Sequence, residues 1–481
     1  MAKERNKIIK GFAWIFAERI TQHAISFILQ IFLARLLLPE QYGVIAMINV
    51  FIAIAGVFVV TGFSSSLIQK KDADDLDFST IFYCSLFVSV LLYVAIYFCA
   101  PFISMFYHMP ALTEITRAYS LVLILSSYHS VQRAFVSRKL KFRSFFYSTT
   151  IGTILSGVVG IIMAYSGFGV WALVAQNLLN ILLNIVVLQF IIEWYPKLIF
   201  SFVRAKELMS FGLNILGASL IGTFFMEIRQ LLIGKYYTAT DLSFYNRGKS
   251  MPDLITSNVG SVINTVLFPS MSNHSDDPVA LKNMTRRAIK TSSYLMFYFL
   301  SLLTIAAKPI IILLLTEKWA PAIPYMQVIC LANMIAVLST VNMQALKASG
   351  RGDVLFKLEF LKKPVFLIFV IIAVNVSVMA VAITMPLYSI YAAYMNMKPN
   401  KEVLGYSIKE QLMDFMPAVL LALAMAVTTV PFLFLDINEY LRLFVQLTIG
   451  TATYWIFSVI FKVDSLYYLR SIINEKLGTK K

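Results

Sequence analysis

Four polar side chains fall within the first long apolar stretch of the chain, where a membrane helix normally holds none. Residues 11–36 carry Glu18, Arg19, Gln22 and His23. An ionisable group at membrane depth costs at least ~2.5 kcal/mol, so such groups face a bundle interior or a water-filled cavity. A guanidinium can bind phosphate, and a carboxylate or an imidazole can exchange protons. The pattern therefore predicts polar binding or proton exchange within a membrane.

The spacing of these residues indicates a two-sided helix. Glu18, Gln22, Ser26 and Gln30 recur at every fourth position. On a helix of about 3.6 residues per turn this spacing makes one polar stripe, and the residues that follow Glu18 and Gln22 lie beside it.

A second helix, over residues 211–235, carries a similar stripe. Ser219, Thr223 and Glu227 are again four residues apart, and Arg229 follows. Glu227 and Arg229 point to different sides of the helix. Arg229 either serves the same polar side or extends toward the outer membrane interface.

Amides in a third segment, over residues 169–192, extend the polar set. Gln176 and Asn180 lie on one side of this helix. An amide both donates and accepts hydrogen bonds, which suits sugar hydroxyls. The alternative is hydrogen bonding between helices, worth about 0.6 kcal/mol per bond.

The composition identifies the elements that must position these residues. The chain has 481 residues, 59% hydrophobic and 14% charged, and its mean hydropathy is +0.76. Such a chain is predicted to be an all-α polytopic membrane protein. The three cysteines lie in apolar runs without a metal-ligand spacing, so neither a metal site nor a disulfide framework is expected.

Hydropathy predicts about 14 transmembrane helices. Continuous spans are expected over residues 113–132, 250–271 and 291–316, and the run 361–397 is divided near Asn375. With the N-terminus inside, Lys and Arg show a roughly fourfold excess in cytoplasmic segments. This bias predicts cytoplasmic termini and explains the net charge of +16 without a nucleic-acid partner.

The chain contains signs of an internal repeat. Gln30 to Arg35 aligns with Gln230 to Lys235, and each segment is followed by an acidic residue and a tyrosine. Parallel repeats are a transporter architecture. The expected division is an N-terminal six-helix lobe over 1–207, a second six-helix lobe over 208–410, and two further helices with a cytoplasmic tail over 411–481.

Several short strings resemble one known family. They include ARLLLPEQYG from Ala34, TGFSSSLIQKK from Thr61, GFGVWALV from Gly167, FYNRGK from Phe244 and TEKW from Thr316. In this order they resemble the polysaccharide transporter (Wzx-type flippase) family of the multidrug/oligosaccharidyl-lipid/polysaccharide (MOP) exporter superfamily.

The resemblance implies two lobes in a V around a central cavity, and a protein without enzymatic activity or a cofactor. It also implies flipping of undecaprenyl-diphosphate-linked oligosaccharide by alternating access in the bacterial inner membrane, for O-antigen, capsule or exopolysaccharide. Membrane lipids and other polysaccharide-assembly membrane proteins are the expected partners. Arg19 is predicted to contact the diphosphate, Glu18 and His23 to tune its charge or carry protons, and Glu227 to bind a coupling H⁺ or Na⁺. Gln22, Arg229, Gln176 and Asn180 complete the predicted substrate-binding set.

Three alternatives stay open. A cation-coupled multidrug antiporter and a peptidoglycan-precursor lipid flippase belong to the same superfamily. A membrane glycosyltransferase would use the acidic pairs Asp72/Asp74 and Asp75/Asp77 to hold a divalent ion, but the charge bias places these pairs inside. In a further alternative, Glu18 and Arg19 only neutralise each other or a neighbouring helix.

Overall fold

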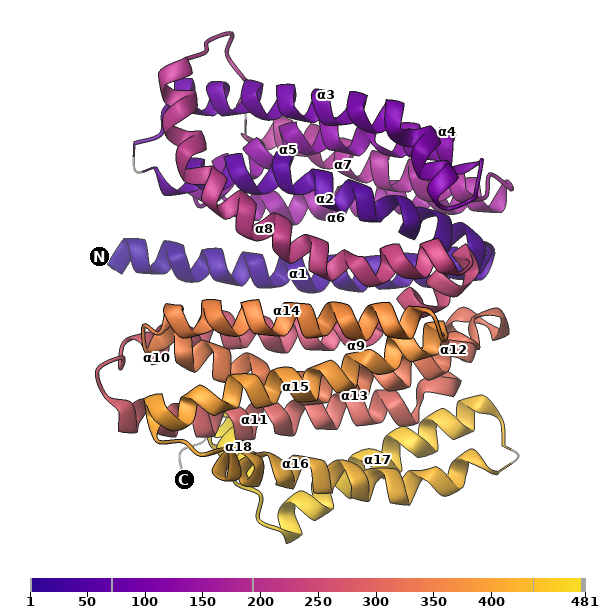
Figure 1. Cartoon of the computed structure of the whole chain (residues 1–481), viewed down its shortest axis with the longest axis vertical. Helices are drawn as coiled ribbons and strands as arrows, with labels where there is room; N and C mark the ends of the chain where they lie inside the picture. The colour runs from indigo at the N-terminus through magenta and orange to yellow at the C-terminus, as the bar shows by residue number, and fades with distance from the viewer. Residues whose placement is uncertain (1, 71, 193, 436, 477–481) are drawn as a thin grey trace. The chain divides into compact units, whose positions relative to one another are not determined.

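The described residues form helices and no strand, in agreement with the predicted fold class. The structure is a computed structural model that describes residues 2–70, 72–192, 194–435 and 437–476. By its internal contacts the chain divides into two compact units, Met1–Ser243 and Phe244–Lys481. Within each unit the long helices lie side by side with their axes close to parallel (Figure 1).

The first unit begins with a long helix and continues through a set of membrane-length helices. In chain order its helices are α1 (Ala2–Leu36), α2 (Pro39–Gln69), α3 (Asp75–Phe106), α4 (Leu112–Tyr119), α5 (Leu121–Arg138), α6 (Arg143–Tyr165), α7 (Val170–Ile192) and α8 (Phe202–Tyr236). The pairs α6–α7, α2–α8 and α1–α6 make the most extensive contacts. Helix α8 runs obliquely across α2 (Figure 1).

The second unit also consists mainly of long helices. Helix α9 (Ala239–Val262) enters it from the first unit and is followed by a π-helical turn at Ile263–Leu267. The remaining helices are α10 (Phe268–Ser272), α11 (Pro278–Ile305), α12 (Ala307–Leu315), a 3₁₀ turn at Glu317–Trp319, α13 (Ala322–Ala348), α14 (Gly352–Val374), α15 (Val378–Leu404), α16 (Ile408–Thr429), a 3₁₀ turn at Val430–Leu433, α17 (Glu439–Ile460) and α18 (Asp464–Lys476).

Helices α1 and α8 support the predicted repeat. Each is 35 residues long, and each is followed by a two-residue break before α2 or α9 begins. The short helices α4 and α12 then follow α3 and α11 in the same order. Ten helices are long and apolar enough to cross a membrane among the described residues. The count of about 14 spans, the boundaries after residues 207 and 410, and the central cavity stay predictions.

Three segments that were expected to be continuous are interrupted. A break at Ser120 separates α4 from α5, where the Ser120 hydroxyl donates to the Arg117 carbonyl at 3.0 Å. Ala306 separates α11 from α12, and the π turn precedes α10. A proline follows each of these two interruptions: Pro309 comes three residues after Ala306, and Pro269 comes two residues after the end of the π turn. Proline lacks the N–H that a regular helix uses. The predicted break near Asn375 is confirmed, because α14 ends at Val374.

Buried apolar clusters hold each unit together. In the first unit one cluster includes Phe78 and Ile81 of α3, Leu188 of α7 and Trp194. In the second unit Leu421, Met425 and Tyr454 join α16 and α17 to α11. Because the outer surface of such a protein faces lipid, its many exposed apolar side chains are expected.

Candidate functional site

The polar stripe of α1 divides into a half-buried part and an exposed part. Glu18 and Gln22 are half-buried, whereas Arg19 and His23 are exposed. Glu18 and Gln22 share a helix side with Leu29, which packs so tightly on α6 that a side chain at Gly157 would collide with it. Consecutive residues of a helix are about 100° apart. The side chains of Arg19 and His23 therefore point away from the side of α1 that packs on α6.

The amides of α7 face α6. The Asn180 amide donates to the hydroxyls of Thr153 at 3.3 Å and Ser156 at 3.2 Å. Gln176 packs closely at Gly160 of the same helix. Small residues on one helix and amides on the other are typical of tight packing between membrane helices. Asn180 thus makes the interhelical hydrogen bonds that the sequence left as an alternative.

The charged residues of α8, Glu227 and Arg229, lie on a helix that packs against other neighbours than α1 and α7 do. Glu227 and Arg229 are both half-buried, and the Gln230 amide donates to the Glu227 carboxylate at 2.6 Å. Helix α8 packs on α2 and α3, whereas α1 and α7 pack on α6. The structure thus gathers Glu18, Gln22, Gln176 and Asn180 around α6. The substrate-binding role of all eight predicted residues stays a prediction.

A buried lysine in the second unit was not among the predicted site residues. Lys362 of α14 is 4% exposed, and its ammonium donates to the Glu359 carboxylate at 2.6 Å and to the side-chain amide oxygen of Asn396 at 3.1 Å. The Asn396 amide in turn donates to the Ser339 hydroxyl at 2.7 Å. In the sequence Lys362 is followed directly by Lys363, a pattern that is typical of a basic loop at the membrane surface. Only the early start of α14 shows that it lies inside a helix.

The acidic pairs at the start of α3 serve the fold. Asp74 caps the helix by accepting from the Asp77 N–H at 2.9 Å. Asp77 is fully buried and accepts from the Lys70 ammonium at 2.9 Å and from Arg204 Nη1, which lies 3.0 and 3.1 Å from its two carboxylate oxygens. The Asp77 N–H, and secondarily Arg204, holds the pKa of Asp74 below its usual range. These carboxylates are therefore committed to ion pairs and a helix cap.

The described residues contain no group of three His, Cys, Asp or Glu side chains that could hold a metal ion. In the acidic segment Asp75 pairs with Lys197 at 2.5 Å. Asp74, Asp75 and Asp77 of this segment thus all interact with other groups of the protein.

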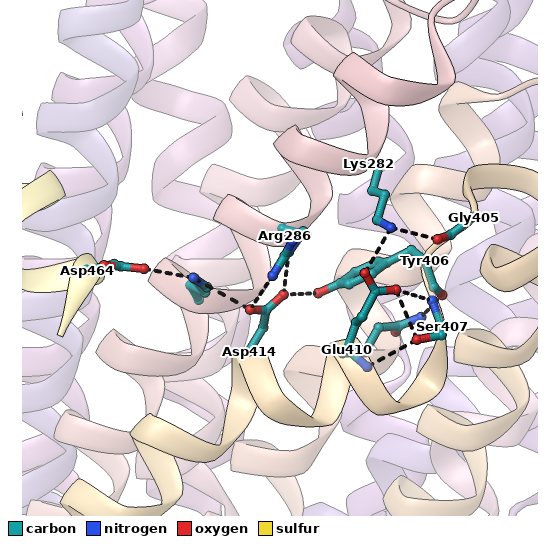
Figure 2. A network of polar contacts seen from close by, with 10 residues as sticks. Lys282, Arg286, Gly405, Tyr406, Ser407, Glu410, Asp414 and Asp464 are labelled. Carbon is teal, nitrogen blue, oxygen red and sulfur yellow. Dashed lines mark hydrogen bonds and ion pairs between the residues drawn. The ribbon is translucent and has the colours of Figure 1, made fainter.

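A corresponding polar network ties three helices of the second unit together (Figure 2). Asp414 of α16 accepts from Arg286 Nε at 2.7 Å and from the Tyr406 hydroxyl at 2.8 Å. Lys282, one turn before Arg286 on α11, donates to Glu410 at 3.0 Å. Burial raises the pKa of Tyr406 above its usual range, so the phenol remains a donor.

Lys290 extends this network to α18. Its ammonium lies 3.5 Å from Asp414 and 2.8 Å from Asp464. The cations thus stand on one side of α11 at intervals of one turn, and the acids stand on α16 and α18 (Figure 2).

Together these helices define a multi-span helical membrane protein. The chain has the fold of a structure described as "Lipid II flippase MurJ, inward closed conformation", with a TM-score of 0.75 and 15% identity over 95% of this chain and 100% of that chain. An inward-facing multidrug resistance MATE family transporter of the MOP superfamily gives a TM-score of 0.58 and 14% identity over 80% of this chain and 94% of that chain.

The sequence comparisons narrow this class to one family. Residues 32–324 match the family described as "Polysaccharide biosynthesis protein". The chain belongs to this family. A relative in Rhizobium meliloti (strain 1021), the "Succinoglycan biosynthesis transport protein ExoT", is 22% identical over 352 residues, which cover 73% of this chain and 71% of the relative.

Proposed function

We propose that this protein is a flippase that moves undecaprenyl-diphosphate-linked oligosaccharide from the inner to the outer leaflet by alternating access. Family membership over residues 32–324 and the fold shared with a lipid II flippase support this class. The observation that carries the proposal is the stripe of α1, where Arg19 and His23 remain exposed beside half-buried Glu18 and Gln22.

A polar path is what such a substrate needs. A diphosphate and sugar hydroxyls that enter hydrocarbon without partners cost several kcal/mol per group. The Arg19 guanidinium can form two parallel hydrogen bonds with phosphate oxygens. Amides such as Gln22 and Gln176 can exchange hydrogen bonds with hydroxyls. These residues would supply the hydrogen bonds that water otherwise makes while the polar part of the substrate crosses the membrane.

Coupling to an ion belongs to the same proposal. An imidazole such as that of His23 can carry a proton, and a half-buried carboxylate such as Glu227 can bind H⁺ or Na⁺. In this proposal the protein lies in the bacterial inner membrane with both termini in the cytoplasm, as the distribution of Lys and Arg predicts.

Glycan export in a deletion strain tests the role of Arg19. We expect Arg19→Ala to abolish complementation while the protein level in the membrane stays equal to that of the wild type. Arg35→Ala is the matched control, because Arg35 lies in the last turn of the same helix and outside the predicted binding set. Normal export in Arg19→Ala cells would refute the binding role of this side chain.

The phenotype of the deletion strain separates the transport classes. Loss of the surface glycan in viable cells supports the proposed function. Drug sensitivity with normal glycan would instead indicate a multidrug antiporter, and lysis would indicate a peptidoglycan-precursor flippase.

A further inference from the structure

A cationic cavity lies between α11 and α18 in the second unit, apart from the residues that the proposed function uses. Its volume is about 480 Å³, and its lining includes Arg286, Arg287, Lys290, Asp464, Ser465 and Tyr468. The cations stand on the third and fourth turns of α11, toward the end of the helix that the charge bias predicts to be cytoplasmic. The cavity is therefore expected at the level of the lipid headgroups.

The positive charge of this cavity is only partly neutralised. Arg286 is paired with Asp414 at 2.7 Å, and Lys290 pairs with Asp464 at 2.8 Å. Arg287 is exposed and forms no ion pair with any residue in the described part of the chain. Its guanidinium lies 4.9 Å from the centre of the Tyr468 ring. The aromatic ring holds this arginine in place without cancelling its charge.

A second, mostly apolar cavity adjoins the cationic one. It has a volume of about 280 Å³ and shares Lys290, Asp464 and Ser465 with its neighbour. The rest of its lining includes Pro417, Leu420, Leu421, Phe461, Lys462 and Val463. Leu420 and Phe461 are 57% and 65% exposed, as expected for side chains that face lipid. A cationic cavity and a mostly apolar cavity thus share one border.

We propose that the two cavities together bind one anionic glycerophospholipid. Its phosphodiester would lie among Arg287, Lys290 and Lys462, and an acyl chain would cover Leu420 and Phe461. Basic pockets between membrane helices on the cytoplasmic side are suited to anionic headgroups. Inorganic phosphate would use the cationic cavity alone, so the apolar slot favours the lipid.

The phosphate of the lipid can break the ion pair between Lys290 and Asp464. Asp464 is 76% exposed on its side chain, and ion pairs with such an exposed partner contribute little to stability. A phosphodiester can therefore replace Asp464 as the partner of Lys290. The bound lipid would contact α11, α16 and the segment before α18, and it would hold α18 against the helix bundle.

Lipid binding by the purified full-length protein in detergent tests this proposal. The probes are dilauroyl-phosphatidylglycerol, dilauroyl-phosphatidylcholine and inorganic phosphate, and the readouts are adduct occupancy by native mass spectrometry and the thermal shift. The variants are Arg287→Gln, Arg287→Gln/Lys462→Gln and the control Lys409→Gln. Lys409 is exposed in the first turn of α16 and lines neither cavity.

We expect the wild type to bind phosphatidylglycerol more tightly than phosphatidylcholine. Because one cation near a membrane surface is worth about 1 kcal/mol, Arg287→Gln should weaken phosphatidylglycerol binding about fivefold, and the double variant further. Lys409→Gln should bind like the wild type. Equal affinity in wild type and Arg287→Gln would overturn the site, and an equal stabilisation by inorganic phosphate would overturn the lipid assignment. None of these readouts depends on transport.

Discussion

The network around Asp414 yields a quantitative prediction about the stability of the second unit. The perturbation is Arg286→Gln, which removes the main cationic partner of a carboxylate whose side chain is 6% exposed. Removing one partner of a buried ion pair costs about 3–5 kcal/mol, because the other charge stays buried without compensation.

The remaining contacts of Asp414 lower this cost. The Tyr406 hydroxyl still donates at 2.8 Å, and the Lys290 ammonium remains at 3.5 Å. Arg286 is itself 38% exposed on its side chain, so solvent screens part of the lost attraction. We therefore expect Arg286→Gln to cost about 2 kcal/mol of unfolding free energy. This loss corresponds to a fall of about 4–8 °C in melting temperature.

The double variant Arg286→Gln/Asp414→Asn supplies the critical comparison. It removes the buried charge together with its partner, so its cost should stay below about 1 kcal/mol. The assay is the thermal unfolding of the purified protein in one detergent, followed by intrinsic fluorescence. A double variant that is less stable than Arg286→Gln would refute the reasoning, because it would show that the carboxylate contributes through something other than the ion pair.

Three further predictions concern the first unit, and thermal unfolding in the same detergent checks each of them. Asp77→Asn should lower the free energy of unfolding by about 3 kcal/mol, because it removes the carboxylate partner of Arg204 and Lys70. Asp75→Asn, at an exposed ion pair, should lower it by less than about 1 kcal/mol. Similar losses of stability in the two variants would contradict the assignment of Asp77 as a buried ion-pair partner. Gly157→Ala should lower the melting temperature through its collision with Leu29, whereas Gly56→Ala, with open space around it, should leave it unchanged or higher; the opposite order would exclude close α1–α6 packing. Asn180→Ala should cost about 1 kcal/mol through the lost bonds to Thr153 and Ser156, and measuring glycan export by this variant separates packing from substrate binding, because export that falls at equal protein level would require a role beyond packing.

Several features of the fold could be predicted because they depend on local composition. Hydropathy identifies a multi-span helical membrane protein without any knowledge of contacts, and the uneven distribution of Lys and Arg among the loops predicts its orientation. The alignment of Gln30 with Gln230 indicated a repeat, and α1 and α8 have equal lengths in the structure. The helix break near Asn375 was also visible, because a polar residue interrupts an apolar run there.

The polar stripe shows the limit of this reasoning. Spacing correctly placed Glu18 and Gln22 on one side of α1, because helix geometry is local. Spacing could not show that this side continues to Leu29 and packs on α6, nor that the Asn180 amide bonds to that same helix. The neighbour of a helix face depends on how the helices assemble, and the sequence of one helix does not contain that information.

The ion pairs were decided by tertiary structure alone. Arg286 and Asp414 are 128 residues apart in the chain, and Arg204 and Asp77 are 127 residues apart. The sequence determined that this protein is a hydrophobic helical membrane protein with a few ionisable residues inside its apolar segments. It could do so because the free-energy cost of placing a charge in hydrocarbon is a property of the residue itself. Which charges pair across the fold, as Arg286 does with Asp414, depended on packing that brings distant segments within 3 or 4 Å.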